Sequence, residues 1–434
     1  MAGIITSGGF TKAAAEGILK DVYIGPVNRL INQKSVLLGR VQREAEGVSG
    51  RQVIVPLHVE ANERVITTGR GGKLPDPKSQ VYDKATVLTK YYYGRIKIDG
   101  PTIADLKDDM GAFLRATESE MQGLAETAAS KQNQQLFGKG DGVRALVDGN
   151  PLANATDIDL RQPWGFPNYA FSKGTQYLRK GQLVIFVRGS SFITNSTGHE
   201  ITVVSPALGA NGRITIAANT MDLADGDKVV LCSHDAITSG NFTLDSEFNN
   251  AILGLGAAID DTSVYLGVDP AVRPIWKANI LGNGGTVRSI EEDLIQQLVD
   301  VIETNSMGSG PTAFLTTHGL RRQYAALLRN DRRFPGMTEV DGGFGVKRTV
   351  LMFQGGNIEI PIFVDRDCPA GFWWGVDEGQ FRFYQKAAWN WMDDDGSILH
   401  RLPDDDAFQA TLRLYTEFAT GARNRHGLLK DLAE

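Results

Sequence analysis

The chain has 434 residues, enough for two to four compact domains, and its 42% hydrophobic and 22% charged residues are typical of a globular protein. These values exclude a single small module, an intrinsically disordered chain and a fibrous repeat. The net charge of −6 is unevenly distributed, because residues 1–100 carry 15 Lys and Arg against 9 Asp and Glu, whereas the remaining 334 residues carry 30 against 42. A basic end and an acidic body favour contacts between copies of the chain, although solvated surface charge is the simpler interpretation.

Disulfides and membrane insertion are not expected. The only cysteines, Cys232 and Cys368, are too few for a disulfide framework. The longest stretch without polar residues, residues 251–259, is far shorter than the roughly 18 residues of a membrane span. The N-terminal sequence lacks the pattern of a secretory signal, so we expect synthesis in a cytosol and no membrane partner.

Residues 1–50 mix short apolar groups with Gly and Ser, and only residues 13–19 show a brief helical pattern. This composition predicts an extended N-terminal arm. At roughly 3.3 Å per residue its contour reaches up to about 160 Å, so the arm can leave its own domain.

Residues 51–100 are predicted to form a long β-hairpin. Apolar and polar residues alternate with a period of two from Arg51 onward, which indicates a strand, and Pro56 confines that strand to a sheet edge. A returning strand is expected over residues 80–99, and the Gly- and Pro-rich residues 69–77 between them predict a turn or loop. The strand face expected to bury apolar side chains consists of Val53, Val55, Leu57 and Val59.

An isolated two-stranded ribbon is at best marginally stable in water, so this hairpin needs a surface to lie on. Its cations favour an acidic surface on a neighbouring copy of the chain; they are Arg64, Arg70, Lys73, Lys78 and Lys84. Two acidic runs are the candidate acceptors, namely Asp393, Asp394 and Asp395, and Asp404, Asp405 and Asp406. The alternative is that the ribbon folds back onto its own domain as an ordinary meander.

A long helix is predicted within residues 101–149. Thr102 is a candidate N-cap with Asp105 three residues later, and apolar residues then recur at spacings of three and four as far as Phe137. The glycines of residues 138–142 end the pattern. At 1.5 Å per residue the helix is about 50 Å long.

Residues 150–240 alternate short apolar runs with Gly, Asn and Asp, which is typical of a small all-β module inserted into a parent domain. Its strands are expected over residues 183–187, 200–204, 213–216 and 228–231.

The segment 241–390 returns to a mixed α/β pattern. Ser289 and Glu292 form an S-x-x-E capping box, which predicts a helix that starts there. Further elements are expected as a helix over 318–329, strands over 311–316, 357–364, 372–374 and 380–384, and, in the C-terminal segment 391–434, a return strand over 411–418.

The sequence carries no catalytic fingerprint. It lacks a phosphate-binding loop, a complete dinucleotide-binding motif, a zincin motif and a nucleophile elbow, and its six histidines are scattered singly. The acidic runs have oxygen ligands suited to Ca²⁺, but a solvated charge run or a landing site for a basic segment is the favoured interpretation. We therefore expect no enzyme activity, no cofactor and no metal, and at most weak contact with DNA that has no sequence preference.

The order of an arm, a long basic hairpin, a long helix and a mixed α/β body resembles the major capsid proteins of tailed bacteriophages, which have the Hong Kong 97 type fold. The resemblance covers nearly the whole chain except residues 150–240. The stretches that carry it locally are residues 265–269 (YLGVD), 274–276 (PIW), 311–322 (PTAFLTTHGLRR), 360–365 (IPIFVD) and 368–371 (CPAG).

This resemblance implies an α+β phage major capsid fold with an inserted small β-barrel-like domain. The implied parts are an N-terminal arm (1–50), the extended loop or β-hairpin (51–100), the spine helix and start of the peripheral domain (101–149), the insertion (150–240), the axial domain with peripheral-domain segments (241–390) and C-terminal return strands (391–434).

The implied function is self-assembly, as hexamers and pentamers, into an icosahedral shell around double-stranded phage DNA. The implied partners are other copies of the chain, a separate scaffolding protein, a portal, decoration proteins and the packaged DNA. The implied location is the virion capsid, assembled in the cytoplasm of a host bacterium. Two alternatives stay open: the shell of an encapsulin-like nanocompartment, and a soluble enzyme with an unrecognised site.

Overall fold

The structure, a computed structural model, describes residues 36–44, 52–101, 110–149, 151, 155–164, 174–193, 199–205, 212–217, 221–328, 338–341, 347–355, 358–394, 396–403 and 405–434. Most of the predicted arm and the predicted helix start at Thr102 lie outside these residues. Two compact units are formed. The first contains the described residues within 89–133 and 385–416, and the second contains those within 36–88, 134–384 and 417–434. No helix of the described part is long and apolar enough to cross a membrane.

The first unit consists of a long helix on a sheet. Its elements are α4 (Met110–Leu136), β4 (Lys90–Asp99), β19 (His400–Arg401), most of β18 (Phe381–Trp391) and most of β20 (Ala407–Thr420). Strand β20 lies between β18 and β4 and pairs antiparallel with β4 from Ala407 opposite Asp99 to Thr416 opposite Lys90. The return strand predicted over residues 411–418 is confirmed, and so is its pairing with the early part of the chain.

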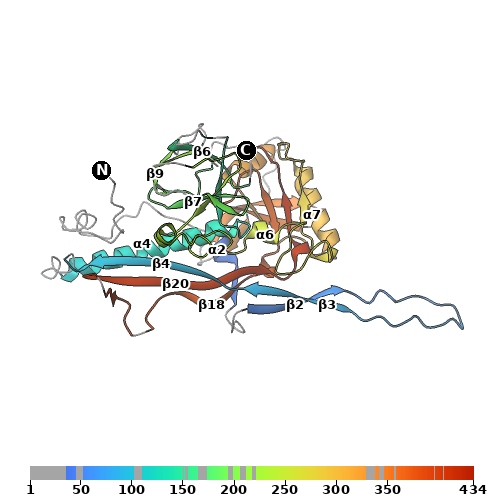
Figure 1. The fold of residues 1–434 in the computed structure, drawn as a ribbon. Coiled ribbons are helices and arrows are strands. Elements are labelled where there is room, and N and C mark those ends of the chain that lie inside the picture. The colour runs from blue at the N-terminus through green and yellow to red at the C-terminus, as the bar shows by residue number, and fades with distance from the viewer. Residues whose placement is uncertain are drawn as a thin grey trace. The chain divides into compact units, whose positions relative to one another are not determined.

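A glycine allows α4 to lie close to β4. A Cβ atom at Gly94 would come within 3.1 Å of the Leu124 side chain, so a larger residue would require that side chain to shift by a few tenths of an ångström. Nearby, the Trp389 indole donates a hydrogen bond of 3.1 Å to Gln132 Oε1, and the Tyr92 ring lies 5.8 Å from the Trp389 ring. Figure 1 shows α4 running along β4 and β20.

The predicted return strand of the hairpin is two strands rather than one. Strand β3 (Val81–Leu88) pairs with β2 (Gln52–Glu60), whereas β4 leaves the hairpin and pairs with β20. The buried positions explain the break, because they have odd numbers in β3 (Ala85, Val87) and even numbers in β4 (Ile96, Ile98). A single strand with a period of two cannot bury both sets on one face, so the prediction of one strand over 80–99 is wrong.

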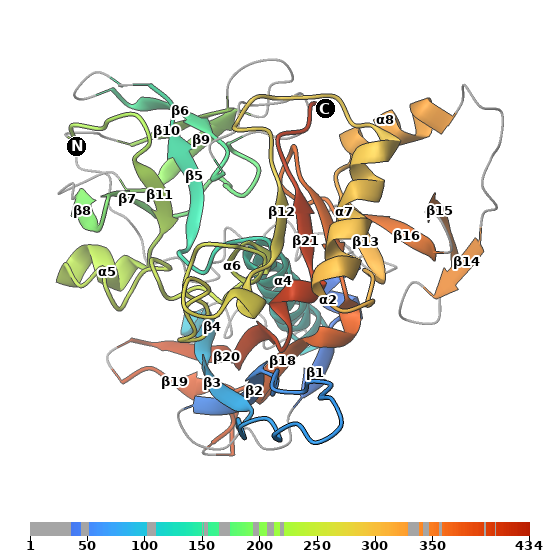
Figure 2. The ribbon, with the colours of Figure 1, turned by 90° about the vertical axis from the view of Figure 1, so that its right-hand side faces the viewer.

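The second unit contains a mixed seven-stranded sheet with two helices. In spatial order its strands are β12 (Asn279–Leu281), β21 (Gly427–Leu429), β17 (Trp373–Val376), β13 (Ala313–Thr316), β16 (Ile358–Val364), β15 (Lys347–Gly355) and β14 (Thr338–Asp341). Helix α7 (Glu292–Asn305) contacts β12 and β21, and α8 (His318–Leu328) contacts β16, as Figure 2 shows. The core between them includes Leu298, Ile302, Phe314, Tyr324 and Trp373, all at most 1% exposed.

The predicted capping box of α7 is not formed. The helix begins at Glu292, the residue before it, Glu291, is the N-cap, and no side chain caps the helix. Ser289 lies too far ahead of the first turn, because Ile290 is 2% exposed and enters the core before the helix starts. Burial of an apolar side chain therefore decides this boundary instead of a polar cap.

A second seven-stranded sheet spans residues 143–231 of this unit. Its strands in spatial order are β8 (Ser191–Ile193), β7 (Val184–Arg188), β11 (Lys228–Leu231), β5 (Val143–Val147), β6 (Asp157–Arg161), β10 (Gly212–Ile216) and β9 (Ile201–Ser205). Ile201 exchanges backbone hydrogen bonds of 2.9 Å with Gly181 and Gln182, so the β9 end of the sheet meets the start of β7 in a barrel-like closure. The four strands predicted in this region are present, and β5, β6 and β8 add three more, of which β5 lies before residue 150.

Short elements complete the second unit. These are α2 (Val36–Arg40), β1 (Gln42–Glu44), α5 (His234–Ser239), α6 (Leu255–Ala258) and the 3₁₀ turns η1 (Pro274–Trp276), η2 (Glu378–Gln380) and η3 (Arg423–Arg425). Strand β1 pairs parallel with Arg382–Tyr384 of β18.

A neutral histidine is locked in the core of the second unit. His426 is fully buried and stacks on Phe381 at 4.1 Å, its Nδ1 accepts the Asp377 N–H at 3.1 Å, and its Nε2 lies 2.8 Å from Thr420 Oγ1. Burial, reinforced by Arg425 and Arg423, lowers the pKa of His426 from 6.5 to about 3. The uncharged ring is therefore part of the folded state.

Acid is expected to destabilise the protein through His426. Because its folded pKa of about 3 lies below the ordinary 6.5, only the unfolded chain takes up this proton between those pH values. The free energy of unfolding should fall with pH in this window by at most about 1.4 kcal/mol per pH unit. Urea unfolding from pH 7 to pH 4 should show a shallower decline in His426→Gln than in the natural chain or in the exposed-site control His234→Gln. Equal slopes would contradict this role.

Candidate subunit interface

The base of the hairpin is a regular antiparallel ladder. Strands β2 and β3 pair from Gln52 opposite Leu88 to Glu60 opposite Val81, and they form a sheet of two strands only. Pro56 of β2 stands opposite Lys84 of β3. The other edge of β2 has no partner strand among the described residues, which agrees with the prediction that Pro56 confines this strand to a sheet edge. The alternation along β2 is also confirmed, because the odd-numbered side chains face inward and the even-numbered ones are exposed.

The inward face of the hairpin packs partly on its own unit. Leu57 is 7% and Val59 8% exposed, and the Thr86 N–H donates a 2.8 Å hydrogen bond to the Leu266 carbonyl oxygen. The expectation that these two apolar side chains bury themselves on a neighbouring copy is therefore wrong. Val53 and Val55 are only partly buried. At its base, the ribbon follows the alternative in which it lies on its own chain.

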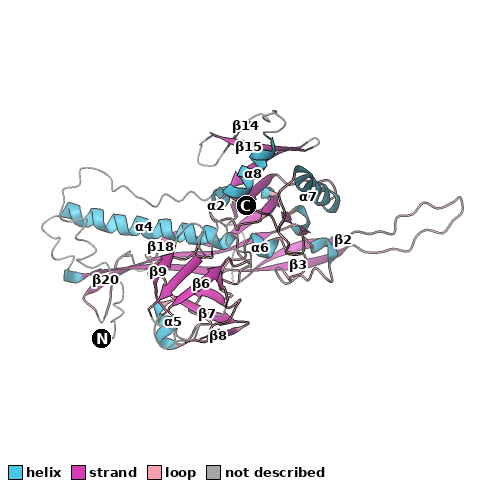
Figure 3. Ribbon diagram, turned by 90° about the horizontal axis from the view of Figure 1, so that it is seen from above, coloured by secondary structure: helices cyan, strands magenta, loops and turns pink. Residues whose placement is uncertain are grey.

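The tip of the hairpin, residues 61–80, contrasts with the base. All 20 residues are exposed, and Figures 1 and 3 show this loop extending away from the rest of the second unit. It closes through a turn in which the Gly72 N–H donates to the Gly69 carbonyl oxygen at 2.9 Å, with Gly71 at φ = 83°, a left-handed value that suits glycine. Among the exposed residues are the large apolar Val65 (86%) and Leu74 (88%).

The five predicted contact cations fall into two groups. Arg64 pairs with Asp76 at 3.4 Å and Lys78 with Glu60 at 3.7 Å, so both are partly neutralised within the hairpin. Arg70 and Lys73, which flank the end of the turn, and Lys84 on β3 have no acidic partner among the described residues. Two of these three cations, Arg70 and Lys73, thus lie at the very tip, and Lys84 lies at the base.

The candidate acidic acceptors are partly engaged in the first unit. Asp394 makes a two-pronged pair with Arg413 at 2.7 and 2.8 Å, and this hydrogen bonding lowers the pKa of the Asp394 carboxyl. Asp405 pairs with Lys97 at 2.5 Å. Asp395 and Asp404 lie outside the described residues, and Asp393 and Asp406 are described at loop positions, where the Asp406 carbonyl oxygen accepts the Gly100 N–H. Their contact with a neighbouring copy stays a prediction.

Sequence reasoning missed an exposed tyrosine cluster on the sheet of the first unit. Tyr91 and Tyr93 of β4 are 56% and 60% exposed, and their rings lie 5.1 and 6.0 Å from that of Tyr415 on β20. Desolvation, together with the 3.3 Å hydrogen bond to Tyr415, raises the pKa of Tyr93 to about 12. Tyrosines at this exposure are common in protein contact surfaces. The signal in the sequence is the run of three tyrosines at residues 91–93, which the predicted hairpin strand over residues 80–99 includes.

Arg273 was missed as well. Its guanidinium lies 3.0 Å from Glu60 and 3.4 Å from Asp83, so it contacts both strands of the hairpin. The contacts span about 190 or more residues of sequence, and no local pattern indicates them.

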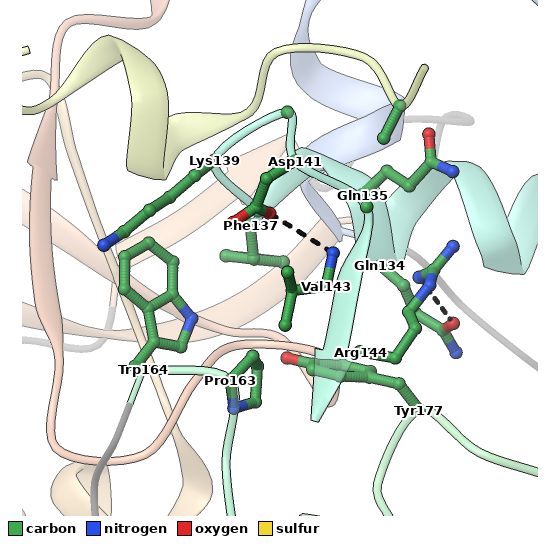
Figure 4. Close-up of a pocket in the computed structure, with 14 residues that line it drawn as sticks. Gln134, Gln135, Phe137, Lys139, Asp141, Val143, Arg144, Pro163, Trp164 and Tyr177 are labelled. Atoms are coloured by element: carbon green, nitrogen blue, oxygen red, sulfur yellow. Dashed lines mark hydrogen bonds between the residues drawn. The ribbon is translucent and has the colours of Figure 1, made fainter. Parts of the chain in front are cut away.

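A pocket where α4 ends is too small to be a substrate site. It has a volume of about 30 Å³, compared with the roughly 300–1,000 Å³ of ligand pockets. Figure 4 shows Lys139 beside Trp164, with Nζ 4.8 Å from the ring centroid, and Arg144 donating to Gln134 at 3.3 Å. In the described part of the chain, no group of three His, Cys, Asp or Glu side chains is arranged to hold a metal ion.

The sequence matches no protein-family model and no curated protein. Among solved structures, the chain is similar to the capsid protein in the asymmetric unit of cyanophage A-1(L), with a TM-score of 0.53 and 13% identity over 98% of this chain and 100% of that chain. The chain has a phage capsid fold. Lower TM-scores of 0.45 are found for the SrpI encapsulin of Synechococcus elongatus PCC 7942 (10% identity, 97% of this chain, 95% of that chain) and for the capsid of the native GTA particle (11% identity, 97% and 98%).

The coarse part of the fold prediction, a mixed α+β chain with a phage capsid fold, is thereby confirmed. The cyanophage match spans almost all of both chains, so the similarity is not confined to one domain. Within this capsid fold, the hairpin tip is the longest described segment whose side chains are all exposed.

Proposed function

We propose that this chain is the major capsid protein of a tailed phage, which self-assembles as hexamers and pentamers into an icosahedral shell around double-stranded DNA. The observation that carries this proposal is a phage capsid fold that presents a 20-residue, fully exposed hairpin tip. An extended segment whose few contacts lie within the hairpin itself, such as Arg64 with Asp76 and Lys78 with Glu60, is costly in conformational entropy unless another molecule orders it. Other copies of the chain are the partner that a shell supplies.

The tip has the composition of a contact surface. Val65, Ile66 and Leu74 supply apolar area, while Arg70 and Lys73 supply charge that complements the acidic part of the chain. A single exposed ion pair contributes about 0–1 kcal/mol, so stability must come from many contacts repeated around the shell. The tyrosine cluster of the first unit is a further surface on which neighbouring copies can meet.

The remaining parts of the chain receive the roles that the resemblance implies. Of the arm predicted over residues 1–50, residues 36–44 form α2 and β1 within the second unit, so the role of reaching a neighbour is proposed for the part that precedes them. The region around 150–240 is a decorating insertion, α4 is the spine helix, and residues 241–390 supply the axial domain. A scaffolding protein, a portal and decoration proteins are the expected partners in the virion. Assembly takes place in the cytoplasm of the host bacterium, and contact with the enclosed DNA is weak and without sequence preference.

Expression of the chain alone, and together with the scaffolding protein encoded beside it, tests this proposal. Negative-stain electron microscopy should show closed shells or capsomers, and particles recovered from infected cells should contain DNA that is protected from nuclease. Shells that enclose protein and no DNA would instead indicate an encapsulin-like compartment. A stable monomer under all conditions, with or without turnover of a small substrate, would overturn the shell proposal.

A further inference from the structure

One arginine joins both strands of the hairpin to the rest of the second unit. Arg273 Nη1 lies 3.0 Å from Glu60 Oε1 on β2, and Arg273 Nε lies 3.4 Å from Asp83 Oδ2 on β3. Its side chain is 26% exposed, so these contacts are partly shielded from water. Lys78, at the end of the tip, also approaches Glu60 at 3.7 Å. Two carboxylates, one from each strand, thus meet one guanidinium.

The contact lies where the ladder of the hairpin ends. The register shifts between His58 and Glu60, so that Val59 forms a β-bulge, and Glu60 opposite Val81 is the last pair before the tip. A bulge bends its strand and increases the local twist. The direction of the tip therefore depends on the geometry at the bulge, and Arg273 holds the two side chains, Glu60 and Asp83, that flank it.

The loop that carries Arg273 is itself firmly held. The Arg273 N–H donates to the Asp269 carbonyl oxygen at 2.9 Å, and Trp276, which is 5% exposed, donates from its indole to the Tyr265 carbonyl oxygen at 3.3 Å. Leu266 adopts a left-handed φ of 52°, which is uncommon for a residue other than glycine, and its carbonyl oxygen accepts the Thr86 N–H. The hairpin thus has a rigid support at a few defined points.

Apolar packing covers only part of the hairpin base. A solvent-open groove of about 260 Å³ runs beside Leu57 and Val59 and is bordered by Arg273, and another of about 460 Å³ runs beside Val53 and Val55. Leu57 and Val59 are buried at 7% and 8% exposure, whereas Val53 and Val55 are only partly buried. The polar contacts at Arg273 and Leu266 therefore add to a small apolar contact in fixing the direction of the hairpin.

We propose that Arg273 is a positioning residue for shell assembly: by clamping Glu60 and Asp83 across the bulge at Val59, it sets the direction in which the hairpin tip leaves the second unit. Loss of the clamp leaves the subunit folded and widens the range of tip directions. Fewer subunits then present the tip in the orientation that a neighbouring copy accepts, and assembly slows. The assembly part of this inference rests on the proposed function, whereas the clamp itself does not.

Hydrogen exchange on the unassembled full-length subunit tests the clamp without reference to assembly. In Arg273→Gln, peptides covering β3 should exchange about 5- to 30-fold faster than in the natural chain, the range that corresponds to losing one or two partly shielded ion pairs. Arg273→Lys should restore part of the protection, and the reversed network Arg273→Glu with Glu60→Lys and Asp83→Lys should restore more. The matched control is Arg64→Gln, which removes an ion pair inside the tip and should leave β3 exchange unchanged.

Assembly kinetics followed by light scattering test the positioning role. Arg273→Gln should slow shell formation about in proportion to the increase in the hydrogen-exchange rate of β3. The midpoint temperature of thermal unfolding should stay that of the natural chain. Unchanged exchange in Arg273→Gln would overturn the clamp. Faster exchange with unchanged assembly would overturn the positioning role. A natural chain that forms no shells while Arg273→Gln still exchanges faster would refute the proposed function and leave the clamp standing.

Discussion

Replacing residues 61–80 with Asn-Gly should abolish shell formation and leave the subunit folded. The 20 removed residues are all exposed, and the new dipeptide joins Glu60 to Val81, the last pair of the ladder, with a turn that suits a two-residue hairpin. The free energy of unfolding should therefore change by less than about 0.5 kcal/mol. Urea unfolding and circular dichroism measure the fold, and electron microscopy of the assembly reaction measures the shells.

A variant with a charge-reversed tip of natural length separates the effect of the tip's charge from the effect of its length. Arg70→Glu with Lys73→Glu reverses the charge of the two tip cations that lack a described acidic partner. If each subunit contact loses about 1.4 kcal/mol, the protein concentration needed for assembly should rise tenfold. The matched control, Lys180→Glu with Arg321→Glu, makes the same change in net charge at exposed positions of the body. Shells of normal number and size from the deletion variant would refute the contact role of the tip.

Arg423→Leu should unfold much of the second unit at mild urea concentrations. The Arg423 side chain is fully buried, stacks 5.0 Å from the centre of the Tyr265 ring and donates to the carbonyl oxygens of Ala258 at 2.8 Å and Ser263 at 3.2 Å. Burial also lowers the pKa of its guanidinium. Since leucine leaves these buried acceptors without donors, the free energy of unfolding should fall by about 3–5 kcal/mol. The same contacts support the segment that precedes the Arg273 loop.

The neighbouring arginine is the control for this experiment. Arg425 makes a 3.3 Å ion pair with Asp377, and its side chain is 37% exposed. Such a pair contributes about 0–1 kcal/mol, so Arg425→Leu should have a small effect on urea unfolding. A similar loss of stability in both variants would show that the buried hydrogen bonds of Arg423 have no special weight.

Several elements of the fold follow from local patterns. The alternation along β2 and the position of Pro56 predicted an edge strand with one inward face, because side chains of a strand point to opposite sides whatever the strand packs on. The glycines of residues 69–77 predicted the turn for a similar reason, since Gly71 needs a left-handed φ. The helical spacing before residue 137 predicted α4.

Other features depend on partners that are distant in sequence. The strand predicted over residues 80–99 is divided because β20, more than 300 residues later, offers β4 a ladder. Two acidic residues predicted to contact a neighbour's hairpin already form ion pairs within their own chain, Asp394 with Arg413 and Asp405 with Lys97. Each of these residues or strands has several possible partners in the sequence. Which partner it contacts depends on the geometry of the folded unit.

The sequence by itself determined the type of most elements, the exposed basic tip and, through its resemblance, the capsid fold. Periodicity and turn chemistry are properties of neighbouring residues, so they can be read without knowing the rest of the molecule. Only the tertiary structure decided which strand joins which sheet, that Leu57 and Val59 pack on their own chain, and that Arg273 meets Glu60 and Asp83. Those contacts form between residues far apart along the chain, and their energies depend on burial and distance, which no local pattern encodes.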